Sequence, residues 1–291
     1  MSSPHHPPPS LDDFRSMAAQ KLWVALDVPG AEAALALTEQ LLPVGVTGFK
    51  VGMSLFNQAG LPVIEAITAR GGRVFLDLKL HDIPSTVART VGVLVAAGVS
   101  FLNVHAQGGR AMMAAAAERA ETVAQQQGLP SPTLIAVTVL TSLSAQALAE
   151  TQMQPSGAAV NVQEYTLHLA KLAFSSGLQG VVCSPQEVAE IHTACGGSFL
   201  CVTPGIRPSP PQEGAGGDDQ HRTLSVTEAL NQGANQLVVG RPIYQASNPA
   251  QAAAEILNEI AFWQQGAATS QGSDALSAQG AVSACIKGHT A

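Results

Sequence analysis

The chain has 291 residues, of which 46% are hydrophobic and 12% are charged, and its formal net charge is −7. Ordinary soluble domains contain roughly a quarter of charged residues, so this composition describes a globular chain with a large apolar interior. The 14 Lys and Arg residues against 21 Asp and Glu residues form no basic footprint, which excludes nucleic acid as an expected partner. A phosphate on a small ligand stays compatible, because a few cations in one pocket can hold it.

The sequence shows no feature that would direct the chain to a membrane or out of the cell. The first twenty residues include Asp12 and Asp13 and contain no apolar run of signal-peptide length. The most apolar stretch, 91–104, is shorter than a membrane span and is interrupted by Gly and Ser. The four cysteines form no CxxC pair, which is typical of reduced thiols. We therefore expect a cytoplasmic protein that contacts no membrane.

Short aliphatic and β-branched runs recur along the chain, and segments of helical period, such as 31–42, 61–70 and 162–177, lie between them. The predicted strands are 22–27, 48–52, 73–79, 101–105, 133–140, 180–183, 199–203 and 236–240. Most of them lack polar and apolar alternation, as expected where both faces of a parallel strand are covered. Eight strand and helix units favour an α/β fold with a single (β/α)8 TIM barrel. A doubly wound open sheet is the alternative.

The two ends of the chain differ in composition from the middle. Residues 1–20 are rich in Pro and His, and residues 266–291 are small and polar with little periodicity. We therefore expect a flexible N-terminal tail at 1–20, a barrel catalytic domain at 21–265 and a flexible C-terminal tail at 266–291. The Pro- and Gly-rich stretch 208–222 follows the seventh strand, and its composition suits a mobile lid or an inert loop.

Charged residues interrupt the apolar runs where the first three strands end. Asp27 ends the first strand, Lys50 lies near the end of the second, Asp77 and Lys79 end the third, and Asp82 follows three residues later. Active sites of such barrels lie at the carboxyl ends of the strands. Residues two apart on a strand share a face, and the next turn can bring Asp82 back towards Lys79. An ammonium between two carboxylates is held protonated, so Lys79 is a candidate proton donor. A structural ion pair, or an acidic residue at a helix start, is the alternative.

A second group of polar residues follows the seventh and eighth strands, where barrels often bind phosphate. Gly240 would let backbone amides approach an anion, and Arg241 offers a bidentate fork. Arg207 and Gln220 could close over the same ligand. A surface cation beside a helix start is the alternative interpretation of Arg241.

Three polar residues after the fourth and fifth strands give a weaker signal. His105 could be a hydrogen-bonded core histidine or take part in chemistry. Thr141 and Ser142 could recognise the edge of a heterocycle, or could be ordinary turn residues.

Taken together, these blocks resemble the orotidine 5'-phosphate decarboxylase family over about residues 20–262. The blocks are LDV at 26–28, FKVG at 49–52, DLKLHDIPST at 77–86, NVHAQGG at 103–109, LTS at 140–142, TPGIRP at 203–208, DQHR at 219–222 and VGRPIY at 239–244. The resemblance implies a homodimeric barrel that converts orotidine 5'-phosphate to UMP and CO2 without a metal or organic cofactor.

The resemblance also implies a role for each matching residue. Lys79 is similar to the lysine that protonates C6, and Asp77 to the carboxylate beside the substrate carboxylate. Lys50 would link the charged row to the ribose, and Asp82 would come across the dimer interface with Ile83 and Thr86. The remaining substrate contacts would be Asp27 at the ribose, Thr141 at the pyrimidine, and Arg207, Gln220, Gly240 and Arg241 at the phosphate.

Two other functions stay open at this point. One is a Mg²⁺-dependent sugar-phosphate decarboxylase or synthase of the same superfamily, which also carries D-x-K-x-x-D. Those enzymes have a metal-binding Glu where this chain has Lys50, and a cation there opposes Mg²⁺ binding. The other is a catalytically silent barrel that binds nucleotides, against which the intact set of Asp77, Lys79 and Asp82 argues.

Overall fold

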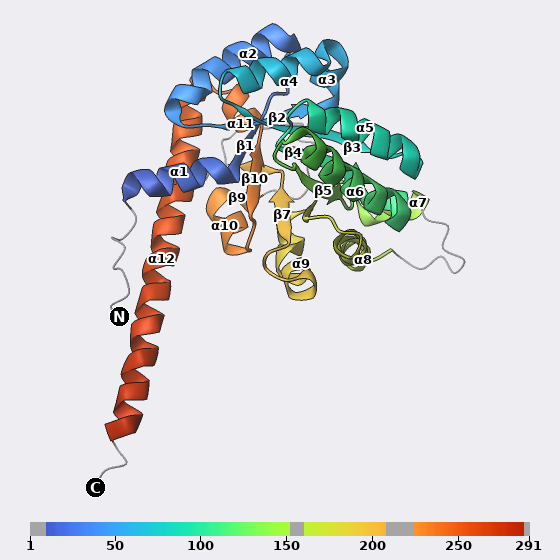
Figure 1. Cartoon of the computed structure of the whole chain (residues 1–291). Helices are drawn as coiled ribbons and strands as arrows, with labels where there is room; N and C mark the ends of the chain where they lie inside the picture. The colour runs from blue at the N-terminus through green and yellow to red at the C-terminus, as the bar shows by residue number, and fades with distance from the viewer. Residues whose placement is uncertain (1–9, 152–159, 208–223, 288–291) are drawn as a thin grey trace.

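The computed structural model describes residues 10–151, 160–207 and 224–287. Eight parallel strands form a closed barrel in the order β1-β10-β7-β6-β5-β4-β3-β2, and helices surround it (Figure 1). The barrel strands are β1 Leu22–Ala25, β2 Gly48–Gly52, β3 Arg73–Leu80, β4 Phe101–His105, β5 Thr133–Val137, β6 Gly180–Val182, β7 Leu200–Thr203 and β10 Gln236–Val239. The predicted TIM barrel is confirmed, and an open sheet is excluded.

Helices follow the strands along the chain, as the periodicity predicts. They are α1 Leu11–Lys21, α2 Gly30–Leu41, α3 Met53–Ala59, α4 Leu61–Ala69, α5 Pro84–Ala96, α6 Gly109–Gln127, α7 Ala145–Thr151, α8 Val162–Ser175, α9 Val188–Cys195, α10 Val226–Asn231, α11 Arg241–Tyr244 and α12 Pro249–Lys287. Two short strands outside the barrel, β8 Ile206–Arg207 and β9 Leu224–Ser225, pair with each other. No described helix is long and apolar enough to cross a membrane.

An aromatic cluster fills the interior of the barrel below its carboxyl end. Trp23, Phe75 and Phe101 are at most 7% exposed, and their ring centroids lie 4.8 to 5.9 Å apart in tilted or edge contacts. Residues two further along β3, such as Asp77, come above this cluster because strand side chains alternate between the two faces. The cluster therefore forms a rigid, dry floor under the polar residues at the barrel mouth.

The two ends of the chain are more regular than their composition indicates. Within the expected flexible tail 1–20, residues 11–20 belong to helix α1, which begins with a capping box between Ser10 and Asp13. Its apolar side buries Phe14 and Ala18, and it packs against α12. The tail prediction therefore does not hold for residues 11–20. The segment is mostly polar, but burial of one apolar stripe is enough to stabilise a helix there. The backbone of α12 continues beyond 265 to residue 287 and leads away from the barrel (Figure 1).

Candidate active site

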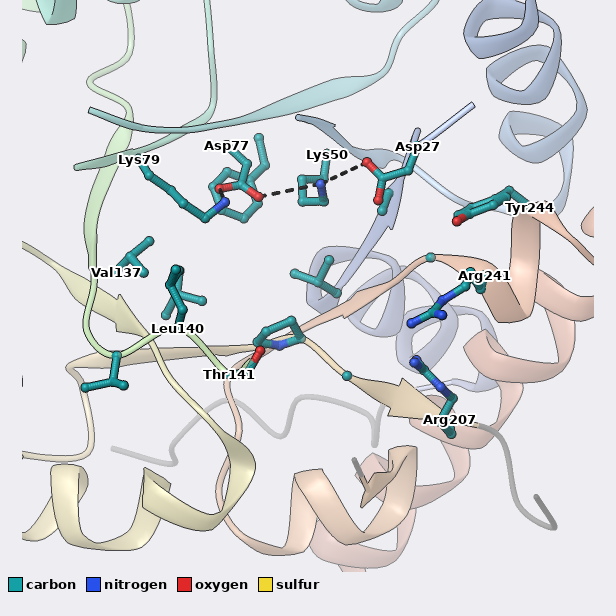
Figure 2. A pocket seen from close by; sticks show the side chains of 18 residues that line it. Asp27, Lys50, Asp77, Lys79, Val137, Leu140, Thr141, Arg207, Arg241 and Tyr244 are labelled. Carbon is teal, nitrogen blue, oxygen red and sulfur yellow. Dashed lines mark hydrogen bonds and ion pairs between the residues drawn. The ribbon is translucent and has the colours of Figure 1, made fainter. Parts of the chain in front are cut away.

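A cavity of about 410 Å³ opens at the carboxyl ends of the barrel strands. Charged side chains form a row along one side, two arginines lie at one end, and apolar side chains face the row (Figure 2). It is lined by Ala25, Asp27, Lys50, Phe75, Asp77, Lys79, Val137, Val139, Leu140, Thr141, Val182, Pro204, Gly205, Arg207, Val238, Gly240, Arg241 and Tyr244. Eight of the twelve predicted site residues therefore meet in this cavity: Asp27, Lys50, Asp77, Lys79, Thr141, Arg207, Gly240 and Arg241.

The charged row alternates in sign along its length. Nζ of Lys50 lies 3.3 Å from Oδ1 of Asp27 and 3.5 Å from Oδ2 of Asp77. Nζ of Lys79 lies 2.7 Å from Oδ1 of Asp77, at the distance of a charge-assisted hydrogen bond. Each ammonium thus has a carboxylate partner, and Asp77 is shared by both. The row holds two positive charges close together without leaving either one uncompensated.

The backbone of β3 is irregular where it carries this row. Leu76 pairs with Leu102 and Leu80 pairs with Val104, so residues 77–79 lie opposite the single residue Asn103. Lys79 has φ +51°, and it is the only non-glycine residue in the described part of the chain with a positive φ. Such strain persists only where the surroundings over-determine it, and it is concentrated at active sites. The bulge thereby directs both Asp77 and Lys79 into the cavity.

Asp77 is a buried carboxylate at the centre of the row. Burial opposes its ionisation, but the charges of Lys50 and Lys79, together with hydrogen bonds from Lys79 and Asn103, outweigh that cost. The pKa of Asp77 therefore lies below its ordinary value of 3.8. The carboxylate stays negative at neutral pH and keeps its position between the two ammonium groups.

The opposite end of the cavity is cationic. Arg207 comes from β8 and Arg241 follows β10, and Figure 2 shows both guanidinium groups turned towards the cavity. Gly240 lies between Ala25 and the ring of Tyr244, since a Cβ at this position would contact both at 3.4 Å. Burial, and then the negative charge of Asp27, raise the pKa of Tyr244 above 10.0, so its hydroxyl stays protonated. Two arginines with an open backbone suit a phosphate group.

Between these ends, one wall is mainly apolar. Val137, Val139 and Leu140 come from the end of β5 and the turn after it, and Thr141 follows them. The predicted strand 133–140 ends at Val137 because the chain turns there across the cavity. A flat heterocycle could lie against this wall with its polar edge at the Thr141 hydroxyl.

Three predicted site residues of this chain lie outside the cavity. Asp82 is exposed, and its Oδ1 accepts a hydrogen bond from the backbone N–H of Ile83 at 2.6 Å. Ile83 is 64% exposed, and Thr86 is half-buried on α5. Asp82 does not line the cavity of the single chain, and α5 begins two residues later at Pro84, so the expectation that the turn returns Asp82 to Lys79 stays a prediction. The remaining predicted site residue, Gln220, lies with the stretch 208–222 outside the described residues.

His105 is set back from the charged row. Its ring stacks on His81 with centroids 5.4 Å apart, and its Nδ1 accepts a hydrogen bond from the backbone N–H of Gln107. Burial, the neighbouring His81 and the charge of Lys79 lower the pKa of His105 to about 4. The ring is thus neutral at pH 7 and does not line the cavity. These contacts favour the structural interpretation of this histidine.

The site geometry bears directly on cation binding. Among the described residues, Asp27 and Asp77 are the two carboxylates that line the cavity, and both contact the ammonium of Lys50. A metal ion between them would have to displace this ammonium or accept its repulsion. Among the described residues, no group of three or more His, Cys, Asp or Glu side chains is placed to hold a metal ion.

Sequence reasoning missed two polar residues of the site. Asn103 lies beneath the row and hydrogen-bonds both Asp77 and Lys79, and Tyr244 lines the cavity beside Asp27. For Asn103 a signal existed, since it is the one amide inside the apolar run FLNVH. Tyr244 gave none, because a tyrosine after Pro and Ile is equally typical of a helix packed on a barrel.

Comparison with known proteins decides between the families that share this geometry. A model described as the Orotidine 5'-phosphate decarboxylase / HUMPS family matches residues 20–256. The chain belongs to this family. A curated orotidine 5'-phosphate decarboxylase from Moorella thermoacetica is 46% identical over 247 residues, which is 85% of this chain and 94% of the relative. Another, from a Nostoc species, is 44% identical over 244 residues, or 84% of this chain and 98% of the relative.

A solved structure of the orotidine 5'-phosphate decarboxylase family has the same fold. The crystal structure of the enzyme from Lactobacillus acidophilus superposes with a TM-score of 0.70 and is 38% identical. The match covers 82% of this chain and 98% of that one. The resemblance noted from the sequence motifs is therefore confirmed.

Proposed function

We propose that this chain converts orotidine 5'-phosphate to UMP and CO2 and that Lys79 supplies the proton that replaces the carboxylate. The observation that carries the proposal is the row of Asp27, Lys50, Asp77 and Lys79 in a cavity whose other end holds two arginines. The row suits a reaction that develops negative charge, and the arginines suit the substrate phosphate. This step belongs to the biosynthesis of pyrimidine nucleotides, and we propose a cytoplasmic location with it.

The chemistry explains why a fixed ammonium is needed. When the bond between C6 and the carboxylate breaks, its electron pair stays on C6 in the plane of the ring, where the π-system cannot delocalise it. CO2 leaves as this bond breaks, the Lys79 ammonium stabilises the charge left on C6, and its proton transfer to C6 then gives UMP. Lys79 afterwards regains a proton from water. Because its carboxylate partner is already in place, the site needs no reorganisation during the reaction.

Asp77 contributes a second effect on the substrate. Its carboxylate is ionised and would face the substrate carboxylate, so like-charge repulsion disfavours the bound ground state. The repulsion disappears when neutral CO2 departs. The binding free energy of the phosphate end, through Arg207 and Arg241, offsets this cost at the reacting end.

The homodimer and the contribution of Asp82 belong to this proposal. Asp82 and Ile83 are exposed on the loop between β3 and α5, and neither lines the cavity. In a two-fold dimer the same patch of each subunit faces the other, so one loop can complete the site of its partner. We propose that Asp82 enters the partner's site in this way, with Ile83 and Thr86 beside it.

A Mg²⁺-dependent sugar-phosphate decarboxylase or synthase is the alternative enzyme. The contact of Lys50 with both Asp27 and Asp77 argues against it, since the ammonium takes the position between the two carboxylates. A silent nucleotide-binding barrel would not need the strained Lys79 backbone.

The test follows the loss of orotidine 5'-phosphate absorbance and the formation of UMP by the purified chain in buffer containing EDTA. We expect complete conversion at a rate that added Mg²⁺ does not raise. No turnover, or turnover only with Mg²⁺, would contradict the proposal. A 3-keto-gulonate phosphate assay with Mg²⁺ identifies the alternative enzyme directly.

A further inference from the structure

Asn103 makes two short hydrogen bonds beneath the charged row. Its Nδ2 donates to Oδ1 of Asp77 at 2.7 Å, and its Oδ1 accepts from the backbone N–H of Lys79 at 2.7 Å. The side chain lies on β4, is fully buried, and is not part of the cavity lining. Asn103 therefore contacts the two central residues of the row without being able to contact a substrate.

The bulge of β3 is located at this residue. Residues 77–79 span the distance that Asn103 alone spans on β4, and on its other side Asn103 pairs regularly with Ile135 of β5. The backbone N–H of Lys79 thus hydrogen-bonds to a side chain, the Oδ1 of Asn103. This bond holds Lys79 at φ +51°, a conformation that is unfavourable for a residue with a side chain when nothing supports it.

An asparagine is the side chain that suits these two bonds. A short primary amide offers a donor and an acceptor at the same distance from the backbone, one for the carboxylate and one for the N–H. An aspartate would keep the acceptor but place a second negative charge beside Asp77, and leucine would have the volume without either bond. Both substitutions change the bonds while nearly preserving the size of the buried group.

We propose that Asn103 is a positioning residue of the decarboxylation, which fixes the Asp77 carboxylate and the Lys79 backbone and acts on the reaction only through them. This rests on the function proposed above. The role is distinct from folding, because removal of the amide should disturb the alignment of Lys79 with C6 while the phosphate end of the cavity stays intact. A misplacement of about 1 Å can cost on the order of 10²-fold in rate.

The first experiment compares Asn103→Leu with wild type by steady-state kinetics and by titration with UMP. We expect kcat and kcat/KM to fall together by about 10²-fold, since the lost interaction acts in the transition state. The affinity for UMP should stay within about twofold, because the arginine end is unchanged. The matched control is Thr38→Val, which removes the hydroxyl of another fully buried side chain, hydrogen-bonded to the backbone oxygen of Ala34 in α2. This control should keep wild-type kcat.

The second experiment uses the pH profile of Asn103→Asp. A protonated carboxyl group at this position can donate to Asp77 and still accept from Lys79, whereas its ionised form repels Asp77. The variant should therefore gain activity as the pH is lowered, with a basic limb that wild type lacks. A purely structural role would lower the activity at every pH by the same factor.

Two results would overturn this proposal. One is a kcat within about twofold of wild type in Asn103→Leu, and the other is an Asn103→Asp profile parallel to wild type. If Asn103→Leu does not fold, the profile of Asn103→Asp decides alone. If wild type itself fails to decarboxylate, the proposed function is wrong.

In that case NMR titration of Asp77 still tests the positioning role. Because the hydrogen bond from Asn103 lowers the pKa of Asp77, this pKa should be higher in Asn103→Leu than in wild type.

Discussion

The ammonium of Lys79 lies 2.7 Å from Oδ1 of Asp77, and the two residues reach this contact across a strand bulge. Lys50 contacts the other oxygen of the same carboxylate. Asp77 therefore has two separable effects: it holds the proton donor in place, and it places a negative charge where the substrate carboxylate must bind.

These two effects predict the kinetics of Asp77→Asn. Loss of the carboxylate frees the Lys79 ammonium, so kcat should fall by about 10²-fold or more. It also removes the repulsion of the substrate carboxylate, so KM should fall as well, which is the signature of relieved ground-state destabilisation. UMP has no carboxylate, and its affinity should show no such gain.

Steady-state kinetics with orotidine 5'-phosphate and titration with UMP test this prediction. Glu39→Gln is the matched control, because it neutralises a carboxylate that pairs with Arg70 on the surface at 2.8 Å. A rise in KM in Asp77→Asn would show that Asp77 aids substrate binding, which contradicts the repulsion proposed for its carboxylate.

Arg241→Ala tests the phosphate end of the cavity. A charged hydrogen-bonding partner contributes about 1.5–3 kcal/mol, so kcat/KM for orotidine 5'-phosphate should fall by roughly 10- to 10²-fold. For orotidine, which lacks the phosphate, the same variant should behave like wild type. Arg110→Ala is the control, since that arginine bonds to Ser175 on the outside of the barrel. An equal loss of kcat/KM with both substrates would show that Arg241 does not act on the phosphate.

Mixed subunits test whether Asp82 acts across a dimer interface. Lys79→Ala and Asp82→Ala should each be nearly inactive alone. After random exchange, about half of the dimers are mixed and one of their two sites is intact, so about a quarter of wild-type activity should return. Activity of the mixture is measured after co-refolding or co-expression. No recovery, with mixed dimers detected by mass, would place Asp82 in the site of its own chain.

The lowered pKa of His105 predicts how the free energy of unfolding depends on pH. Its pKa of about 4 in the folded chain lies below the ordinary value of 6.5, so the unfolded chain binds more protons between these two pH values. The free energy of unfolding therefore falls as the pH is lowered from about 6.5 to about 4. In His105→Gln, Tm should decline less over this window than in wild type. Thermal melts check this, with the exposed His168→Gln as control. Equal declines would contradict the assignment.

The barrel could be predicted from the sequence because its signal is local. Each predicted strand overlaps an observed one, since runs such as LWVA are apolar enough to be buried on both faces. Strand ends are harder to predict: the run 133–140 stops pairing at Val137 because the turn across the cavity needs residues of the same apolar type. Helix α1 was missed since its buried stripe is short.

The cavity residues could also be predicted, but not how they are held. Position at a strand end identified Asp27, Lys50, Asp77 and Lys79. The rule that residues two apart share a face gave the right side for Asp77 and Lys79, yet a regular strand would not contain a left-handed Lys79. That conformation depends on Asn103, which lies 24 residues away in sequence from Lys79. For Asp82 the turn could not be predicted from residue spacing, since its side chain is exposed and bonds to the backbone of Ile83.

The decarboxylation rate of Lys79→Ala tests the central claim most directly. General acid catalysis and electrostatic stabilisation each contribute about 10²-fold or more, so kcat/KM should fall by at least about 10⁴-fold. UMP should still bind to the variant, because Arg207 and Arg241 at the other end of the cavity are unchanged. A variant that binds UMP and has lost turnover is the predicted result. Turnover near the wild-type rate would contradict the role of Lys79 as proton donor.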